Sequence, residues 1–108
     1  MTYRVVVTAA AKQNLRSAYH WAAQRAPLTA AAWLERFEIH LESLASFPER
    51  GQLAPENNLV DEEIRQSIFG RRQGAYRALY TIVGDEVRVL HVRRAARDWA
   101  TADDLRPE

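Results

Sequence analysis

The 108-residue sequence lacks several features that would point to common classes of protein. It has no cysteine, which excludes disulfides and thiolate metal ligands and is typical of a reducing, cytoplasmic compartment. No apolar run approaches the roughly 18–20 residues that cross a bilayer, and the first residues lack the layout of a signal peptide. A glycine-rich phosphate loop, a zinc-binding pattern and a catalytic triad are also missing. We therefore expect a cytoplasmic protein with no membrane association, no cofactor and no bound metal.

The composition that is present is that of a globular protein. Hydrophobic residues make up 47% of the sequence and charged residues 27%, which argues against a disordered chain. The length fits one domain near the commonest size. We predict a single domain over residues 1–108, in which residues 98–108 form a C-terminal extension.

Arginine is concentrated in one part of the chain. Residues 65–97 contain eight arginines and only two acids, for a net charge of +6. Residues 1–64 have a net charge of −2, and residues 98–108 a net charge of −3. Arginine offers planar, bidentate donors to phosphate and carboxylate groups. The block is either a solvated basic face or a surface for an anionic partner, such as nucleic acid or an acidic protein segment.

One strand and a first helix are predicted near the N-terminus. Residues 2–7 alternate between two faces, as in a strand. Residues 9–26 carry apolar side chains at helical spacing. Thr8 is suited to cap this helix, and Pro27 is expected to end it.

A second helix is predicted over residues 30–47. Thr29 is the expected N-cap, and Pro48 is the residue expected to end the helix. Because the connection to the first helix is short, the two helices should pack antiparallel. The apolar stripe expected to be buried against a sheet consists of Trp33, Phe37, Leu41 and Leu44.

Three strands are predicted in the second half of the chain, after a long loop over residues 48–63. They cover residues 64–69, 75–83 and 86–93, and a Gly-Asp pair forms the tight turn between the last two. This order predicts an α+β fold with an N-terminal strand, an antiparallel helical hairpin and a three-stranded antiparallel meander. One face of the sheet should pack on the helices, and the other should be free for chemistry or binding.

Arg77 is the sharpest candidate for a functional residue. It lies in the middle of an apolar strand, on the face opposite to the one expected to meet the helices. An isolated exposed arginine on a strand needs no functional explanation. Several guanidinium groups in one place, however, repel one another unless an anion bridges them. Four more arginines are expected to converge with Arg77 at one end of the sheet: Arg65, Arg93, Arg94 and Arg97.

His91 is the histidine predicted to lie on a strand near these arginines. It is either a general acid or base at neutral pH or an ordinary packed and hydrogen-bonded residue. The alternation leaves open which face of the last strand is buried, since apolar side chains occur on both faces. His20 and His40 lie on helices without metal-type spacing and are expected at the surface.

With this order of elements, the chain resembles the RelE/ParE superfamily over nearly its whole length. These proteins are the toxins of type II toxin–antitoxin modules and include plasmid stabilisation proteins. Residues 44–51, LASFPERG, are similar to the family's helix end and Pro-Gly loop. Residues 76–80, YRALY, are similar to its Tyr-Arg-x-x-Tyr/Phe strand, and residues 91–99, HVRRAARDW, to the arginine-rich end of its last strand.

The resemblance implies a growth-inhibiting toxin with a cognate antitoxin encoded nearby. A disordered, acidic C-terminal segment of the antitoxin would fold across the toxin in a hetero-oligomer. The surface expected to bind the antitoxin or the target comprises Arg65, Arg71, Arg72, Arg77, Arg93, Arg94, Arg97 and Trp99.

The branches of the superfamily differ in their targets. RelE-like toxins cleave mRNA in the ribosomal A site, where basic residues stabilise the phosphate charge, whereas ParE-like toxins poison DNA gyrase through protein contacts. Arg65 and Ser67 stand on the strand where RelE has lysines, and Trp99, which cannot transfer a proton, stands where RelE has a tyrosine. These departures favour the ParE-like mode. The catalytic residues that the resemblance implies for a ribonuclease are Arg77, His91, Arg94 and Arg97.

Three functional hypotheses follow. The preferred one is a gyrase-directed or otherwise non-catalytic toxin. The second is a ribosome-dependent mRNA endonuclease. The third is a member of the superfamily that has lost toxicity and acts only as a binding partner.

Overall fold

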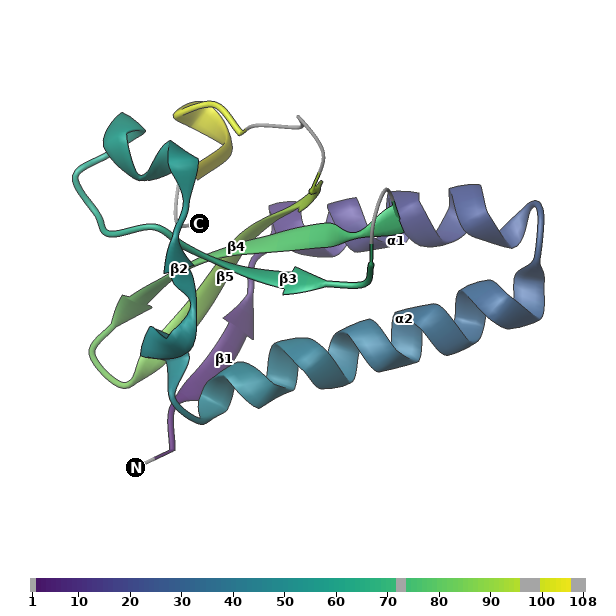
Figure 1. The fold of residues 1–108 in the computed structure, drawn as a ribbon, viewed down its shortest axis with the longest axis horizontal. Helices are drawn as coiled ribbons and strands as arrows, with labels where there is room; N and C mark the ends of the chain where they lie inside the picture. The colour runs from purple at the N-terminus through teal and green to yellow at the C-terminus, as the bar shows by residue number, and fades with distance from the viewer. Residues whose placement is uncertain (1, 72–73, 96–99, 106–108) are drawn as a thin grey trace.

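The structure, a computed structural model, describes residues 2–71, 74–95 and 100–105. In this part of the chain, two α-helices lie against a five-stranded sheet (Figure 1). None of the described helices is long and apolar enough to cross a membrane. The elements in chain order are β1 (Arg4–Val7), α1 (Ala9–Ala23), α2 (Pro27–Glu42), β2 (Gln52–Leu53), β3 (Arg65–Phe69), β4 (Tyr76–Val83) and β5 (Glu86–Arg94).

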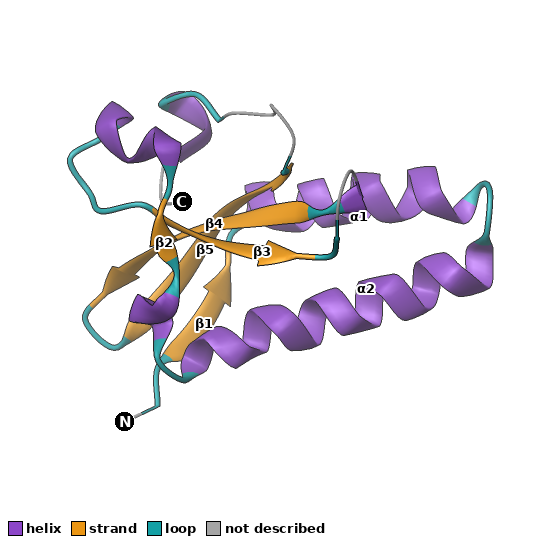
Figure 2. Ribbon diagram, in the orientation of Figure 1, coloured by secondary structure: helices purple, strands orange, loops and turns teal. Residues whose placement is uncertain are grey.

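The sheet has the strand order β1-β5-β4-β3-β2. β1 runs parallel to β5, with Val5 opposite Val87, and the other neighbouring pairs are antiparallel. The predicted α+β fold, with its N-terminal strand, helical hairpin and meander, is confirmed. The segment 48–63, predicted as a loop, also contains β2 and two 3₁₀ helices, Pro48–Arg50 and Pro55–Leu59 (Figure 2).

The first helix begins where the sequence predicts. The Thr8 hydroxyl oxygen accepts a hydrogen bond from the Ala11 amide at 3.2 Å, so Thr8 is the N-cap of α1. The same hydroxyl donates to the Leu90 carbonyl of β5 at 3.1 Å. Thr8 therefore starts the helix and also ties it to the sheet.

The second helix begins and ends earlier than predicted. The sequence predicts that Pro27 ends the first helix, but α1 already ends at Ala23, and Pro27 opens α2. Proline is favoured at the first helical position, where its missing N–H has no partner to lose. The predicted cap at Thr29 is therefore wrong. At its other end, α2 stops at Glu42 and a 3₁₀ turn, Ser43–Ala45, follows. Pro48 lies beyond this turn and does not end the helix.

The helix-facing side of the sheet carries the main hydrophobic core. Phe37 is fully buried, and its ring centroid lies 4.6 Å from that of Phe69 and 6.1 Å from that of Tyr76. Trp33 is half-buried and meets the Phe37 ring edge-on at 5.4 Å. The helical hairpin extends past the end of the sheet (Figure 1), so burial decreases toward its tip. The expected burial is confirmed for Phe37 and is only partial for Trp33.

A β-bulge decides which side chains of β5 are buried. Leu79 of β4 pairs with His91, but the next residue, Tyr80, pairs with Val89. Leu90 is therefore an extra residue that shifts the alternation of side chains by one position. This shift explains why both faces of the strand look apolar in the sequence. The helix-facing core receives valines from both sides of the bulge: Val87, Val89 and Val92.

The second face of the sheet is covered, which contradicts the expectation of a free face. The 3₁₀ helix Pro55–Leu59 and the C-terminal residues 100–105 lie side by side over it (Figure 1). Together with the sheet they enclose a smaller buried cluster: Ala54, Ile64, Leu79, Leu90, Ala100 and Leu105.

Candidate partner-binding site

Arg77 lies in a buried ion pair on the second face of the sheet. Its Nη1 donates to Glu56 Oε1 at 2.9 Å, and its Nη2 donates to Glu56 Oε2 at 2.7 Å. Nη1 also donates to Gln66 Oε1 at 3.1 Å. Arg77 is 3% exposed and Glu56 1% exposed. The expectation of an arginine available to a ligand is wrong, because the guanidinium is already bound within the chain.

Glu56 connects the pair to the C-terminal segment. Its Oε2 also accepts a hydrogen bond from the Ala100 amide at 2.9 Å. Burial by itself raises the pKa of this carboxyl group, but the hydrogen bonds from Arg77 and Ala100 outweigh burial and place the pKa below its ordinary value. Glu56 is therefore ionised at neutral pH. No spacing in the sequence brings it to the arginines, because the path of segment 48–63 depends on tertiary contacts.

A second carboxylate, that of Asp104, lies beside Arg93 and His91. Arg93 lies directly opposite Arg77 in the register of β4 and β5, and its Nη2 donates to Asp104 Oδ2. His91 is 7% exposed, with Nε2 3.7 Å from Asp104 Oδ1. Burial raises the pKa of Asp104, but the Thr101 amide and Arg93 more than offset this, and the pKa lies below its ordinary value. The two carboxylates neutralise arginines that would otherwise repel across neighbouring strands.

Arg65 lies away from this cluster. It pairs with Tyr80, three positions along β4 from Arg77, and its side chain shares the helix-facing side with Tyr80. Its Nη1 donates to the carbonyl oxygens of Glu49 at 3.0 Å and Gly51 at 2.7 Å. Arg65 therefore holds the loop after α2, and the predicted convergence of the arginines at one end of the sheet is wrong.

His40 also differs from its expected place at the surface. It is half-buried, and its Nε2 lies 2.7 Å from Ser67 Oγ, so it joins α2 to β3. Burial and the charge of Arg50 lower the pKa of His40 below its ordinary value. His20 is exposed, as predicted.

Arg94 has its side chain on the opposite face of the sheet from Arg93. It pairs with Tyr76, whose ring packs against the helix-facing core, and it is exposed. Arg71 is exposed in the turn after β3. Three more residues of the predicted binding surface lie outside the described residues: Arg72, Arg97 and Trp99.

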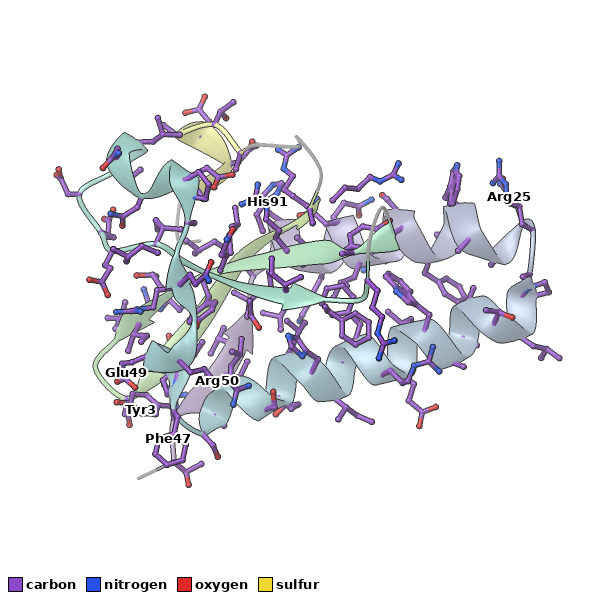
Figure 3. The ribbon with its side chains drawn as sticks, in the orientation of Figure 1. Tyr3, Arg25, Phe47, Glu49, Arg50 and His91 are labelled. Atoms are coloured by element: carbon purple, nitrogen blue, oxygen red, sulfur yellow. The ribbon has the colours of Figure 1, made fainter. Side chains whose placement is uncertain are left out.

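A groove of about 270 Å³ lies between the helical hairpin and the end of the sheet, and we name it the hairpin groove. Trp33, Tyr76 and several alanines make most of its lining apolar, while the exposed Arg36 and Arg94 add positive charge. Trp21 also lines it and is 57% exposed. The guanidinium carbon of Arg25, at the tip of the hairpin (Figure 3), lies 4.0 Å from the Trp21 ring centroid.

The hairpin groove is suited to an apolar side chain accompanied by carboxylates. Sequence reasoning assigned Arg94 to a binding surface but did not single out Trp21 or Arg36. The sequence could have indicated both residues as surface candidates, since each lies on a predicted helix but outside the apolar stripe that packs on the sheet. In the described ranges, no group of three or more His, Cys, Asp or Glu side chains could hold a metal ion.

Comparison with known proteins classifies the chain. The family model described as "ParE toxin of type II toxin-antitoxin system, parDE" matches residues 5–99. The chain belongs to the ParE toxin family. It is also similar in fold to a chain of the solved structure "Chromosomal ParDE TA system from P. aeruginosa". That match has a TM-score of 0.70 and 18% sequence identity, and covers 86% of this chain and 96% of the other. No curated protein sequence matches.

In this ParE-family chain, the described residues that the resemblance implies for mRNA cleavage do not share one accessible site. Arg77 and His91 lie under the cover of the second face. Arg94 is exposed on the other side, at the hairpin groove. Among the described residues of the predicted binding surface, Arg71 and Arg94 are exposed, and Arg94 lines the hairpin groove.

Proposed function

We propose that this ParE-family protein is a growth-inhibiting toxin that acts in the cytoplasm on DNA gyrase through protein contacts. The supporting observation is the buried, bidentate pair of Arg77 and Glu56. Phosphate cleavage requires cationic donors aimed at the charge that develops in the transition state. The guanidinium of Arg77 is instead bound to a carboxylate. A toxin that acts through contacts needs no such donor.

A cognate antitoxin is proposed to neutralise the toxin by docking in the hairpin groove. An acidic segment with an apolar side chain complements the lining, because Trp33 offers apolar contact while Arg36 and Arg94 attract carboxylates. Such segments commonly fold on binding. The toxin and the antitoxin would therefore form a hetero-oligomer.

Replacing His91 with glutamine should leave toxicity nearly unchanged. His91 is buried beside Asp104 and has no catalytic role in a toxin that acts through contacts. The wild type and His91→Gln are expressed in a host without the antitoxin, and growth, mRNA cleavage at ribosomes and the DNA-damage response are followed. We expect both proteins to arrest growth and induce the DNA-damage response, without codon-specific cleavage. The purified wild type should inhibit supercoiling by gyrase.

Two results would contradict a toxin that acts on gyrase through contacts. Codon-specific cleavage by the wild type, reduced about 10²- to 10⁴-fold in His91→Gln, would restore the ribonuclease hypothesis. Equal protein levels, checked by immunoblot, exclude a trivial loss of the variant. Normal growth on expression of the wild type would instead indicate a member that only binds.

Charge reversal of Arg94 should weaken the antitoxin complex. Arg94→Glu is expected to slow association by about tenfold at low salt, within the range usual for interface variants. The effect should shrink at high salt, because exposed charges are screened. Interferometry with the protein encoded by the adjacent reading frame measures the association rate at both salt concentrations.

Arg16→Glu provides a matched control for this experiment. Arg16 is exposed on α1 and lies outside the hairpin groove. Its Nη1 donates to Gln13 Oε1, on the same helix, at 2.8 Å. Both variants change the net charge equally. An equal slowing by Arg16→Glu would show that general charge, not the groove, steers the antitoxin.

A further inference from the structure

Phe47 combines two unfavourable features. Its φ is +54°, and it is the non-glycine residue with a positive φ in the described part of the chain. Left-handed backbone is uncommon for bulky residues and is strained. The side chain is also 78% exposed, so burial of the ring does not offset the strain. In Figure 3, Phe47 projects from the end of the molecule opposite to Arg25.

The loop that presents Phe47, residues 46–51, is held in place by side chains. Donors from β3, β4 and the loop itself bind the backbone carbonyls on both sides of the ring. These bonds run from Tyr80 Oη to Pro48 O (2.5 Å), from Arg65 Nη1 to Glu49 O (3.0 Å) and Gly51 O (2.7 Å), and from Arg50 Nη1 to Ser46 O (3.3 Å).

Close packing at Gly51 restricts the same loop. A Cβ atom at this position would lie 2.1 Å from Tyr80 Oη and 2.8 Å from the Gln66 carbonyl oxygen, so only glycine fits. Tyr80 is fully buried and cannot move aside easily. The loop therefore holds the Phe47 backbone in one conformation before any partner arrives, which lowers the ordering cost of binding.

We propose that Phe47 is the aromatic anchor through which the toxin contacts its protein target, with the ring entering an apolar pocket of that target. This proposal rests on the proposed function. Aromatic anchors contribute a large share of binding energy in protein interfaces. The fold does not explain this residue, because glycine or asparagine would adopt the same backbone with less strain.

The charges around Phe47 favour the target over the antitoxin as its partner. The adjacent Glu49 and Arg50 carry opposite charges, and each is hydrogen-bonded within the chain, Glu49 by Tyr3 Oη at 3.1 Å and Arg50 to Ser43 Oγ at 2.7 Å. The ring is offered without surplus positive charge, unlike the hairpin groove. Phe47 follows the C-terminal end of α2, whereas the groove lies toward its N-terminal end. A helix of 16 residues separates such ends by about 24 Å.

Phe47→Gly is the decisive variant, because it removes the ring and relieves the strained backbone. We expect a melting temperature equal to or above that of the wild type, loss of growth inhibition, and at least a tenfold loss of gyrase inhibition in a supercoiling assay. Phe47→Asn, which also tolerates left-handed backbone, serves as a second variant if the glycine variant does not fold. Leu59→Ala is the control: it shortens another side chain that is 50% exposed and should change neither activity.

Other results of these experiments would overturn the role of Phe47, the gyrase proposal, or both. Growth arrest by Phe47→Gly at wild-type strength would overturn the anchor and leave the gyrase proposal intact. A wild type that arrests growth without inhibiting gyrase would refute gyrase as target, and the growth comparison would still decide the role of Phe47. Weaker binding to the protein of the adjacent reading frame, or a change of oligomeric state in light scattering, would assign the ring to the antitoxin or to a second copy and overturn the proposal. A wild type that arrests no growth would overturn both proposals.

Discussion

Replacing Arg77 with methionine is expected to lower the free energy of unfolding by about 3–5 kcal/mol, because the change leaves the Glu56 carboxylate buried without its cation. The two side chains are 4% and 0% exposed, so water does not screen the loss. Chemical denaturation of the wild type and Arg77→Met at pH 7 measures the difference. A loss this large would be a substantial part of the stability of a small domain.

The double variant Arg77→Met/Glu56→Gln should recover most of this loss. A buried ion pair replaced by neutral groups of similar size is often close to neutral in stability, and the glutamine oxygen can still accept the Ala100 hydrogen bond. Arg88→Met is the control, since the Arg88 side chain is 34% exposed and its pair with Glu86 should contribute less than about 1 kcal/mol. If Arg77→Met and the double variant lost equal amounts of unfolding free energy, Arg77 and Glu56 would not be energetically coupled.

Acidification should remove the stabilisation that the pair of Arg77 and ionised Glu56 gives to the wild type. The pKa of Glu56 in the folded protein lies below the ordinary value of 4.5. Stability from its ionisation is therefore complete above about pH 4.5 and is lost as the pH falls through the lower folded-state pKa. The wild type should lose stability on acidification more steeply than the double variant. Glu86 and Asp104, whose pKa values are also lowered, are present in both proteins and do not affect the comparison.

The elements of the fold could be predicted because their signals are local. Alternation along 76–83, helical spacing along 9–23 and the cap at Thr8 each depend on residues close in the chain. The misplaced boundary at Pro27 has a local cause as well, because proline is compatible with both the end of one helix and the start of the next. The bulge at Leu90 is less visible, since it depends on pairing with β4.

The candidate site could not be predicted to the same extent, because its contacts join distant segments. Arg77 and Glu56 are 21 positions apart, and Glu56 and the Ala100 amide are 44 positions apart. From the sequence, the excess of arginine in residues 65–97 is interpreted as a solvated face or as a surface for an external anionic partner. In the structure, Arg77 and Arg93 are instead paired with carboxylates of the same chain, those of Glu56 and Asp104.

This self-neutralisation changes how the net charge should be interpreted. The described arginines of residues 65–97 do not form one basic face, because Arg77 and Arg93 are bound on the covered second face of the sheet while Arg65 holds a loop. Arg94 remains exposed at the hairpin groove. An acidic partner therefore meets a narrow positive feature beside apolar side chains, which favours specific docking over general attraction.

Truncating Phe37 to alanine is expected to cost about 3–5 kcal/mol, since the ring is fully buried and the neighbouring side chains cannot fill the cavity. Its closest ring neighbour is Phe69 of β3, with centroids 4.6 Å apart, so the truncation would leave a cavity between α2 and β3. Trp33→Ala should cost less because Trp33 is half-buried, but it should also weaken antitoxin binding through the hairpin groove. Thermal unfolding of both variants measures the two costs.

The matched control for Phe37→Ala is Ile39→Ala on the same helix. Ile39 is 63% exposed, so its truncation should change the free energy of unfolding by no more than about 0.5 kcal/mol. For a domain of this size, the Phe37 variant should melt more than about 10 °C below the wild type. A melting temperature within a couple of degrees of the wild type would mean that the helix-facing core does not depend on this ring, and that α2 is held to the sheet mainly by Leu41 and by Leu44 of the 3₁₀ turn that follows it.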